Sequence, residues 1–99
     1  MDFLHKYDLT DEDILEITNR NGEAIINNIV LNKDNIIKVI DYLLEVGLNK
    51  SVIRDLFVQQ IGMFFRTKEE IADVFDEYEI DSIIKSLNYD VNTVDLIEF

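Results

Sequence analysis

The sequence has no cysteine, no proline and no tryptophan, and only three of its 99 residues are glycine. Without cysteine the chain forms no disulfide, binds no metal through thiolates and has no cysteine nucleophile. His5 is the only histidine, and a lone histidine does not make a zinc site. No H-x-x-x-H pair, glycine-rich phosphate loop or G-x-S-x-G motif occurs. These absences exclude the commonest sequence signatures of enzymes and metalloproteins.

Long apolar runs are missing as well. No run of about 18 apolar residues occurs, so the sequence predicts no membrane-spanning helix and no membrane partner. The opening residues, MDFLHKYD, mix charged and apolar side chains and do not resemble a secretory signal peptide. The lack of cysteine fits a reducing compartment. We therefore expect a cytoplasmic protein.

Basic residues are scarce and unevenly placed. Nine bases oppose 21 acids, which gives a formal net charge of −12 at pH 7. Residues 1–68 carry 11 acids and 8 bases, a net charge of −3, whereas residues 69–99 carry 10 acids and only Lys85, a net charge of −9. A chain of this charge repels phosphate backbones, so we expect a basic protein as its partner and no direct binding of nucleic acid. A role in solubility alone is the other explanation of the charge.

Apolar residues recur at helical spacing along most of the chain. In DNIIKVIDYLLEV, residues 34–46, they fall every three or four positions and form one broad apolar face. Hydrophobic residues make up 47% of the sequence, enough for a core. We predict a single all-α domain over residues 1–99, a compact stack of six or seven short helices arranged as helical hairpins. The predicted helices cover residues 11–20, 23–31, 34–46, 50–65, 68–78 and 82–89, followed by a last short turn.

Polar residues and glycines mark the expected helix ends. Gly22 and Gly47 are placed to end helices, and Gly62 to end or bend one. The terminal Phe99 is expected to pack on the core. The predicted N-caps are Thr10, Asn49, Thr67 with Glu70 in the capping-box position, Asp81, and either Asn92 or Thr93.

Two segments of the sequence resemble each other. When FLHKYDLTDEDILEITNRNGEAII is aligned with YLLEVGLNKSVIRDLFVQQIGMFF, Leu9 falls on Leu48 and the expected cap Thr10 on Asn49. Self-similarity between segments of this length is typical of stacked helix pairs, although two amphipathic helix pairs also align by chance. The predicted repeats cover residues 3–34 and 36–71, with a partial third copy at residues 74–99.

The segment IDYLLEVGLNKSVIRDLFVQQIGMFFRTKEEI resembles the mTERF-like repeat, and YDLTDEDILEITNRNGEAIINN resembles it less closely. The resemblance implies a small helical solenoid with a concave face that binds nucleic acid through basic residues. The proline usual before the Phe-rich turn is missing, because Ile61 and Gly62 occupy that region. The bases available for such a groove are Lys50, Arg54, Arg66 and Lys68.

Carboxylate pairs are plentiful, for example Glu69 with Asp73, and Asp73 with Asp76 or Glu77. Such pairs serve acid–base catalysis only where burial changes their protonation. At these positions of an amphipathic helix the side chains face water. We therefore predict a protein that is not an enzyme and that has no cofactor and no metal site.

The segment EEIADVFDEYEID, residues 69–81, holds seven carboxylates and no base. On one continuous helix this gives about one charge per 2.6 Å, against about one per 1.7 Å of duplex DNA. We predict that this acidic face mimics DNA and blocks the basic, nucleic-acid-binding site of a partner protein. An inhibitor or immunity protein encoded by a phage or plasmid fits this pattern. The predicted contacts are Glu69, Glu70, Asp73, Asp76, Glu77 and Glu79, with Tyr78 or Tyr89 as an aromatic anchor.

Two alternatives remain open at this point. The first is a nucleic-acid-binding helical repeat, as the family resemblance implies. The second is a homo-oligomeric or structural domain in which Met63, Phe64 and Phe65 form an exposed apolar patch. The sequence predicts no particular oligomeric state.

Overall fold

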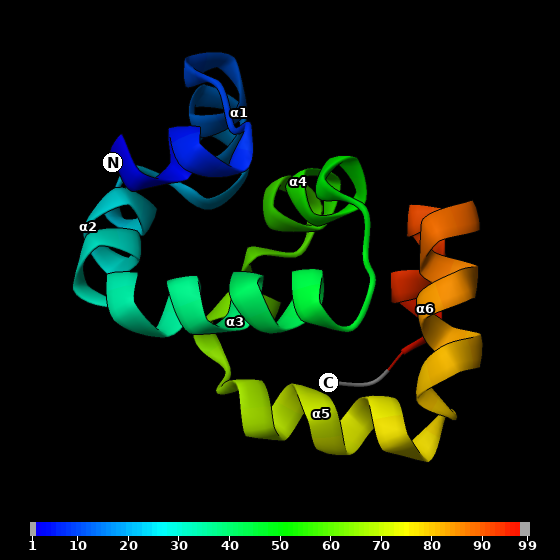
Figure 1. Ribbon diagram of the computed structural model, residues 1–99. Coiled ribbons are helices and arrows are strands. Elements are labelled where there is room, and N and C mark those ends of the chain that lie inside the picture. Colours follow the sequence, from blue (N-terminus) through cyan, green and yellow to red (C-terminus); the bar gives the residue numbers. More distant parts are fainter. Residues whose placement is uncertain (1, 98–99) are drawn as a thin grey trace.

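The computed structural model describes residues 2–97, and all regular elements in this range are helical (Figure 1). The predicted all-α class is therefore confirmed. No strand occurs within these residues. The six α-helices are α1 Asp11–Asn21, α2 Ala24–Leu31, α3 Lys33–Glu45, α4 Lys50–Gln59, α5 Lys68–Glu77 and α6 Ile80–Tyr89, and the three 3₁₀ helices are η1 Asp2–Tyr7, η2 Ile61–Phe65 and η3 Val91–Leu96.

Helix starts follow the predicted capping chemistry at two places. The Thr10 hydroxyl accepts from the Asp13 amide at 3.2 Å, and the Asp13 carboxylate accepts from the Thr10 amide at 2.9 Å, which completes a capping box. The Thr67 hydroxyl accepts from the Glu70 amide at 3.2 Å. The Glu70 carboxylate accepts from the Thr67 hydroxyl, at 3.3 Å. Each cap satisfies amides that the first turn of a helix leaves free.

Three predicted caps are wrong in position or chemistry. Asn49 lies at the N-cap of α4, but its side chain makes no capping hydrogen bond. Asp81 lies inside the first turn of α6, and Glu79 occupies the N-cap without a side-chain bond. The cap of η3 is Asp90, whose carboxylate accepts from the Asn92 amide at 3.0 Å. The helix predicted over residues 50–65 divides into α4 and η2, and the expected contact of Phe99 lies outside the described residues.

The core lies where α3 crosses the middle of the molecule, between α5 on one side and α1 and α4 on the other (Figure 1). From α3, Ile36, Val39, Ile40 and Leu43 are fully buried. Removing such side chains from water contributes about 1.5–3 kcal/mol each to folding. The rings of Phe57 and Phe64 meet edge to face with centroids 4.8 Å apart, a geometry that aromatic pairs prefer. The other fully buried large side chains include Leu4, Leu9, Ile17, Ile29, Leu56, Ile71, Phe75 and Leu87.

Burial contradicts the predicted patch of Met63, Phe64 and Phe65. Met63 is 4% exposed, Phe64 is fully buried and Phe65 is half-buried against the core. The reason is that η2 turns the chain back under α3 and α4, which it contacts. These three residues therefore do not form the exposed apolar patch of that alternative.

Two turns in different parts of the chain share a hydrogen-bond pattern and a residue with positive φ. Asp8 and Gly47 have positive φ angles of 67° and 106°. The Asp8 amide donates to the His5 carbonyl at 3.2 Å, and the Gly47 amide donates to the Leu44 carbonyl, also at 3.2 Å. This is the pattern of a Schellman motif, in which a left-handed residue ends one helix before the next begins. In each turn the next amide also bonds back, from Leu9 to Leu4 and from Leu48 to Leu43.

Glu79, between α5 and α6, also has a positive φ angle, as does Gly22 between α1 and α2. The φ angle of Glu79 is 62°, and its amide donates to the Asp76 carbonyl at 3.3 Å. The order of two α-helices followed by a 3₁₀ helix occurs twice, as α3–α4–η2 and as α5–α6–η3. These equivalences agree with a repeated unit, whereas the division at residues 3–34, 36–71 and 74–99 stays a prediction.

Candidate functional site

Helix α5 turns an acidic face away from the core. Ile71 and Phe75 are fully buried on its inner side. The carboxylates of Glu69, Asp73, Asp76 and Glu77 follow at i, i+4, i+7 and i+8 and all four residues are exposed, so they form one stripe along the opposite side. Figure 1 shows α5 along the edge of the molecule, packed beside α3 and leading into α6. We call these four residues the α5 acidic stripe.

No base neutralises the α5 acidic stripe. Within residues 3–97, none of its four carboxylates has a basic partner within 4.0 Å. Glu70 differs from them, because it lies 3.4 Å from the Arg66 guanidinium and also joins the Thr67 cap. Glu79 is exposed and belongs to the left-handed turn after α5. Of the six predicted carboxylates, only that of Glu70 therefore has a basic partner among the described residues and a role in a helix cap.

Tyr42, on α3, lies beside the α5 acidic stripe. Its ring stacks on Phe75 with centroids 6.4 Å apart, which brings α3 against α5. Burial raises the pKa of the Tyr42 phenol, and the negative charges of Asp76 and Glu45 raise it further. Sequence reasoning did not find Tyr42 or Glu45, because no local pattern connects them with a helix that begins much later in the chain.

The two candidate anchors differ in position and exposure. Tyr78 follows directly after α5 and is 40% exposed, so part of its ring packs on the protein. Tyr89 is 93% exposed and ends α6. Of the two candidate anchors, Tyr78 is therefore the one that adjoins the α5 acidic stripe.

The four bases proposed for nucleic acid do not form one cluster. Lys50 opens α4, whereas Arg66 and Lys68 follow η2, beyond the other end of α4 (Figure 1). Arg54 lies 3.8 Å from Asp55, and Arg66 is the partner of Glu70. Two of the four cations thus already face carboxylates. Such exposed pairs are weak, but they lower the positive potential available to a phosphate backbone.

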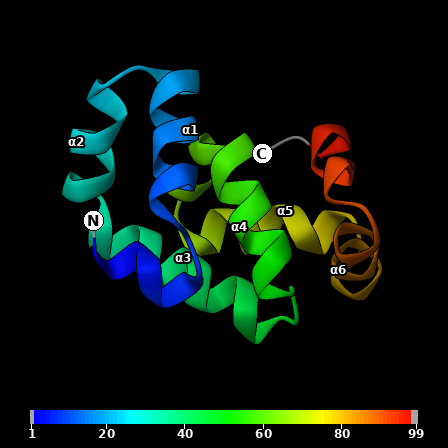
Figure 2. The same cartoon turned by 90° about the horizontal axis from the view of Figure 1, so that it is seen from above.

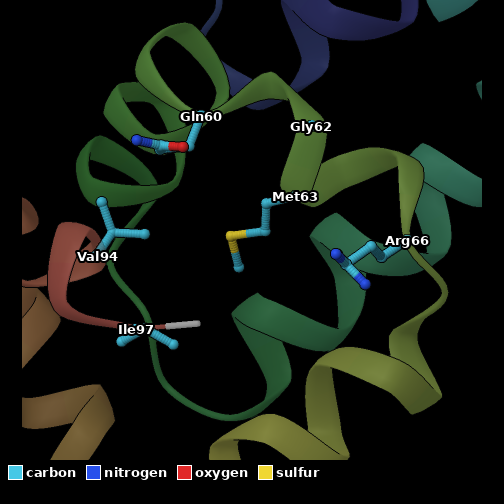
Figure 3. A pocket seen from close by; sticks show the side chains of 6 residues that line it. All are labelled: Gln60, Gly62, Met63, Arg66, Val94 and Ile97. Atoms are coloured by element: carbon cyan, nitrogen blue, oxygen red, sulfur yellow. The ribbon is translucent and has the colours of Figure 1, made fainter. Parts of the chain in front are cut away.

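A pocket of about 270 Å³ opens between η2 and η3 (Figure 3). Met63 points into it, and Val94 and Ile97 line the facing side. Gln60 at its rim donates to Asp95 at 3.2 Å, and Arg66 lies against Glu70. The polar groups around this pocket are therefore engaged with the protein itself.

Apart from Tyr7, which is 5% exposed, the remaining titratable side chains of the described residues are exposed or partly exposed. No polar or charged residue is buried within residues 3–97, and in the same range no group of three or more histidine and carboxylate side chains is arranged to hold a metal ion. His5 is exposed, with Nε2 3.1 Å from a carboxylate oxygen of Asp11. None of the helices described is both long and apolar enough to cross a bilayer. The most distinctive surface feature of the described residues is therefore the α5 acidic stripe.

Comparison with protein-family models, with curated proteins and with solved structures finds no significant match to this chain.

Proposed function

We propose that this chain is a non-enzymatic binding protein whose α5 acidic stripe occupies a basic, nucleic-acid-binding groove on a partner protein. The observation that carries the proposal is the stripe itself: four exposed carboxylates without a counter-cation, on a helix fixed to the core by Ile71 and Phe75. A rigid array of like charges attracts a complementary groove over long range and accelerates association.

The charge spacing on α5 supports a resemblance to nucleic acid. Five acids lie between Glu69 and Glu77, eight helical steps apart. At about 1.5 Å per step this is about one charge per 2.4 Å, a density near that of duplex DNA, which carries about one per 1.7 Å. The helix ends at Glu77 and Glu79 follows in the turn, whereas α6 carries only Asp81 and Lys85 as charged residues, so a partner meets one straight acidic segment, α5. The continuous helix assumed for residues 69–81 does not form.

The arrangement also costs stability, which favours a role in binding over solubility alone. Like charges at i, i+4 destabilise a helix, and Asp76 and Glu77 face the negative end of the helix dipole. Acids placed elsewhere would give the same solubility at a smaller cost. An inhibitor or immunity protein carried by a phage or plasmid is the class that fits this proposal.

A capture experiment with charge-reversed variants tests the proposal. The chain is immobilised, host lysate is applied at low salt, and proteins released by high salt are identified. Asp73→Lys with Glu77→Lys should abolish capture of basic, nucleic-acid-handling proteins. The control, Glu23→Lys with Asp34→Lys, changes exposed acids elsewhere and shifts the net charge equally, from −12 to −8.

Competition identifies the surface that the partner uses. Duplex DNA added to the captured complex should release the partner, because both ligands need the same groove. Equal capture by the two double variants would contradict the proposal, and so would a partner that binds DNA and this chain together.

A second candidate is a nucleic-acid-binding repeat of the mTERF-like kind. The observation that favours it is the twofold order of two α-helices and a 3₁₀ helix. It requires Lys50, Arg54, Arg66 and Lys68 to contact phosphate. Fluorescence anisotropy with labelled DNA and RNA tests it directly: salt-sensitive binding that is lost in Arg54→Ala would favour this candidate over the acidic mimic.

A further inference from the structure

A second surface, separate from the α5 acidic stripe, lies where α6 meets η3. These two elements form one end of the molecule, and α1 and α2 form the other (Figure 2). A concavity of about 440 Å³ opens on this end, lined by Lys85, Ser86, Tyr89, Asp90 and Thr93. We call it the α6–η3 concavity.

The most exposed aromatic side chain of the described residues stands at this concavity. Tyr89 leaves 93% of its surface in water, although tyrosine rings gain stability from burial of their apolar part. Lys85 lies one helical turn before Tyr89, on the same face of α6. It is the only base of residues 69–99, and none of the described carboxylates lies within 4.0 Å of it.

The charges around Tyr89 are self-complementary. Lys85 lies on one side of the tyrosine along the chain and Asp90 on the other, and both line the concavity. A two-fold rotation that brings two such surfaces together places Lys85 of each copy opposite Asp90 of the other. A cavity of about 150 Å³ holds a benzene molecule, so a concavity of this size admits a phenol ring.

We propose that two copies of this chain associate through the α6–η3 concavity about a two-fold axis. Each Tyr89 ring enters the concavity of the other copy, and two reciprocal Lys85–Asp90 pairs fix the orientation. We assign a second copy as the occupant because this surface carries a cation, Lys85, and an anion, Asp90, beside the protruding ring of Tyr89. Such a surface is complementary to an identical surface rotated about a two-fold axis. Tyrosine is enriched among residues that dominate the energy of such interfaces.

The net charge gives this dimer an unusual dependence on salt. Two chains of charge −12 repel each other, and salt screens that repulsion over about 8 Å at 0.15 M and over about 3 Å at 1 M. Added salt should therefore strengthen the dimer. The complex between the α5 acidic stripe and a basic groove should instead weaken with salt, because it joins opposite charges. The two proposals rest on different residues and fail independently.

Sedimentation equilibrium of the full chain, over a range of concentrations at low and high salt, tests the dimer. We expect monomer at low salt and a growing dimer fraction at high salt. Tyr89→Ala should weaken dimerisation at least about tenfold, a typical loss for an interface anchor. The matched control is Tyr78→Ala, which removes the other exposed tyrosine and should leave the dimer unchanged.

Charge variants test the orientation. Lys85→Glu places like charges opposite each other and should weaken the dimer about tenfold or more. Asp90→Asn removes the charge but keeps the oxygen that caps η3, so it should weaken the dimer without unfolding. Monomer at every salt and concentration would overturn the proposal, as would a dimer that is insensitive to both Tyr89→Ala and Lys85→Glu.

Discussion

Asn88 on α6 holds the backbone of the α3–α4 turn around Asn49. Its side-chain oxygen accepts from the Asn49 amide at 2.9 Å, and its side-chain nitrogen donates to the Gly47 carbonyl at 3.0 Å. One amide side chain thus satisfies a donor and an acceptor that the left-handed turn at Gly47 leaves outside the helices. The contact also joins α6 to a turn much earlier in the chain.

The Asn88 contact predicts a stability effect. Asn88→Ala leaves the Asn49 amide and the Gly47 carbonyl without a protein partner, which should lower the free energy of unfolding by about 1–2 kcal/mol. Urea denaturation measures the change. The control is Asn27→Ala, at an exposed position of α2, where the higher helix propensity of alanine predicts no loss. Equal stability of both variants would mean that water replaces the Asn88 side chain without cost.

The two glycines beside α4 should respond differently to alanine. Gly47 has a φ of 106°, and a Cβ there would lie 3.8 Å from the Ile84 Cγ2, an ordinary contact. Gly47→Ala should therefore lower the free energy of unfolding by about 1–2 kcal/mol, because alanine disfavours a positive φ angle. Gly62 has no positive φ, and a Cβ there meets open space. Gly62→Ala should change stability by less than about 0.5 kcal/mol, and thermal unfolding of both variants separates the two cases.

Charge reversal on α5 should have opposite effects at its two ends. Glu77 lies in the last turn, which contains no base, so Glu77→Lys should raise stability by about 0.3–1 kcal/mol at low salt. Glu69 lies in the first turn, where a negative charge is favourable. Glu69→Lys should therefore fail to stabilise the fold, although it changes the net charge by the same amount. If both reversals stabilise the fold equally, overall repulsion dominates over the helix dipole.

Two tyrosines make the fold sensitive to alkaline pH. Burial raises the pKa of Tyr7, and the hydrogen bond from its hydroxyl to Asp41, 3.1 Å long, raises it further together with the Asp41 charge. The pKa of Tyr42 is raised in the same direction. Because the pKa of each tyrosine is raised in the folded state, each contributes its full stabilisation below the unfolded-state pKa of about 10. This stabilisation is lost as the pH rises through the folded-state pKa.

The melting temperature should therefore fall above about pH 10. Tyr42→Phe keeps the ring against Phe75 but cannot ionise, so its melting temperature should fall less steeply with pH, each variant being referred to its own value at pH 7. Tyr7→Phe should flatten the alkaline slope as well, while it loses the Asp41 hydrogen bond at every pH. An unchanged slope in the double variant would mean that other groups control alkaline unfolding.

Local patterns in the sequence predicted the helices well. The apolar period of residues 34–46 corresponds to α3 within one residue at each end, and Thr10, Thr67 and Gly47 act at the predicted ends. These features depend on neighbours within one or two helical turns, which a sequence displays directly.

Features that depend on distant residues were not predicted. Glutamate has no preference for a left-handed turn, so Glu79 gave no signal, and the cap of α6 was placed at Asp81 instead. The Asn88 contact and the meeting of Tyr42 with Phe75 join positions that lie far apart in the sequence. At the candidate site, composition located the acids of α5, but only the fold separated Glu70, which faces Arg66, from the free stripe.

The succession of short helices, each packed mainly on elements close to it in the chain, has a consequence for kinetics. Loops that close over short distances lose little entropy before their contacts form, so folds of this kind reach the native state in microseconds to milliseconds. Refolding also has no slow phase from prolyl isomerisation, because the chain contains no proline. A chain that refolds this quickly exposes its many isoleucines only briefly, and its high negative charge keeps unfolded copies apart during that time.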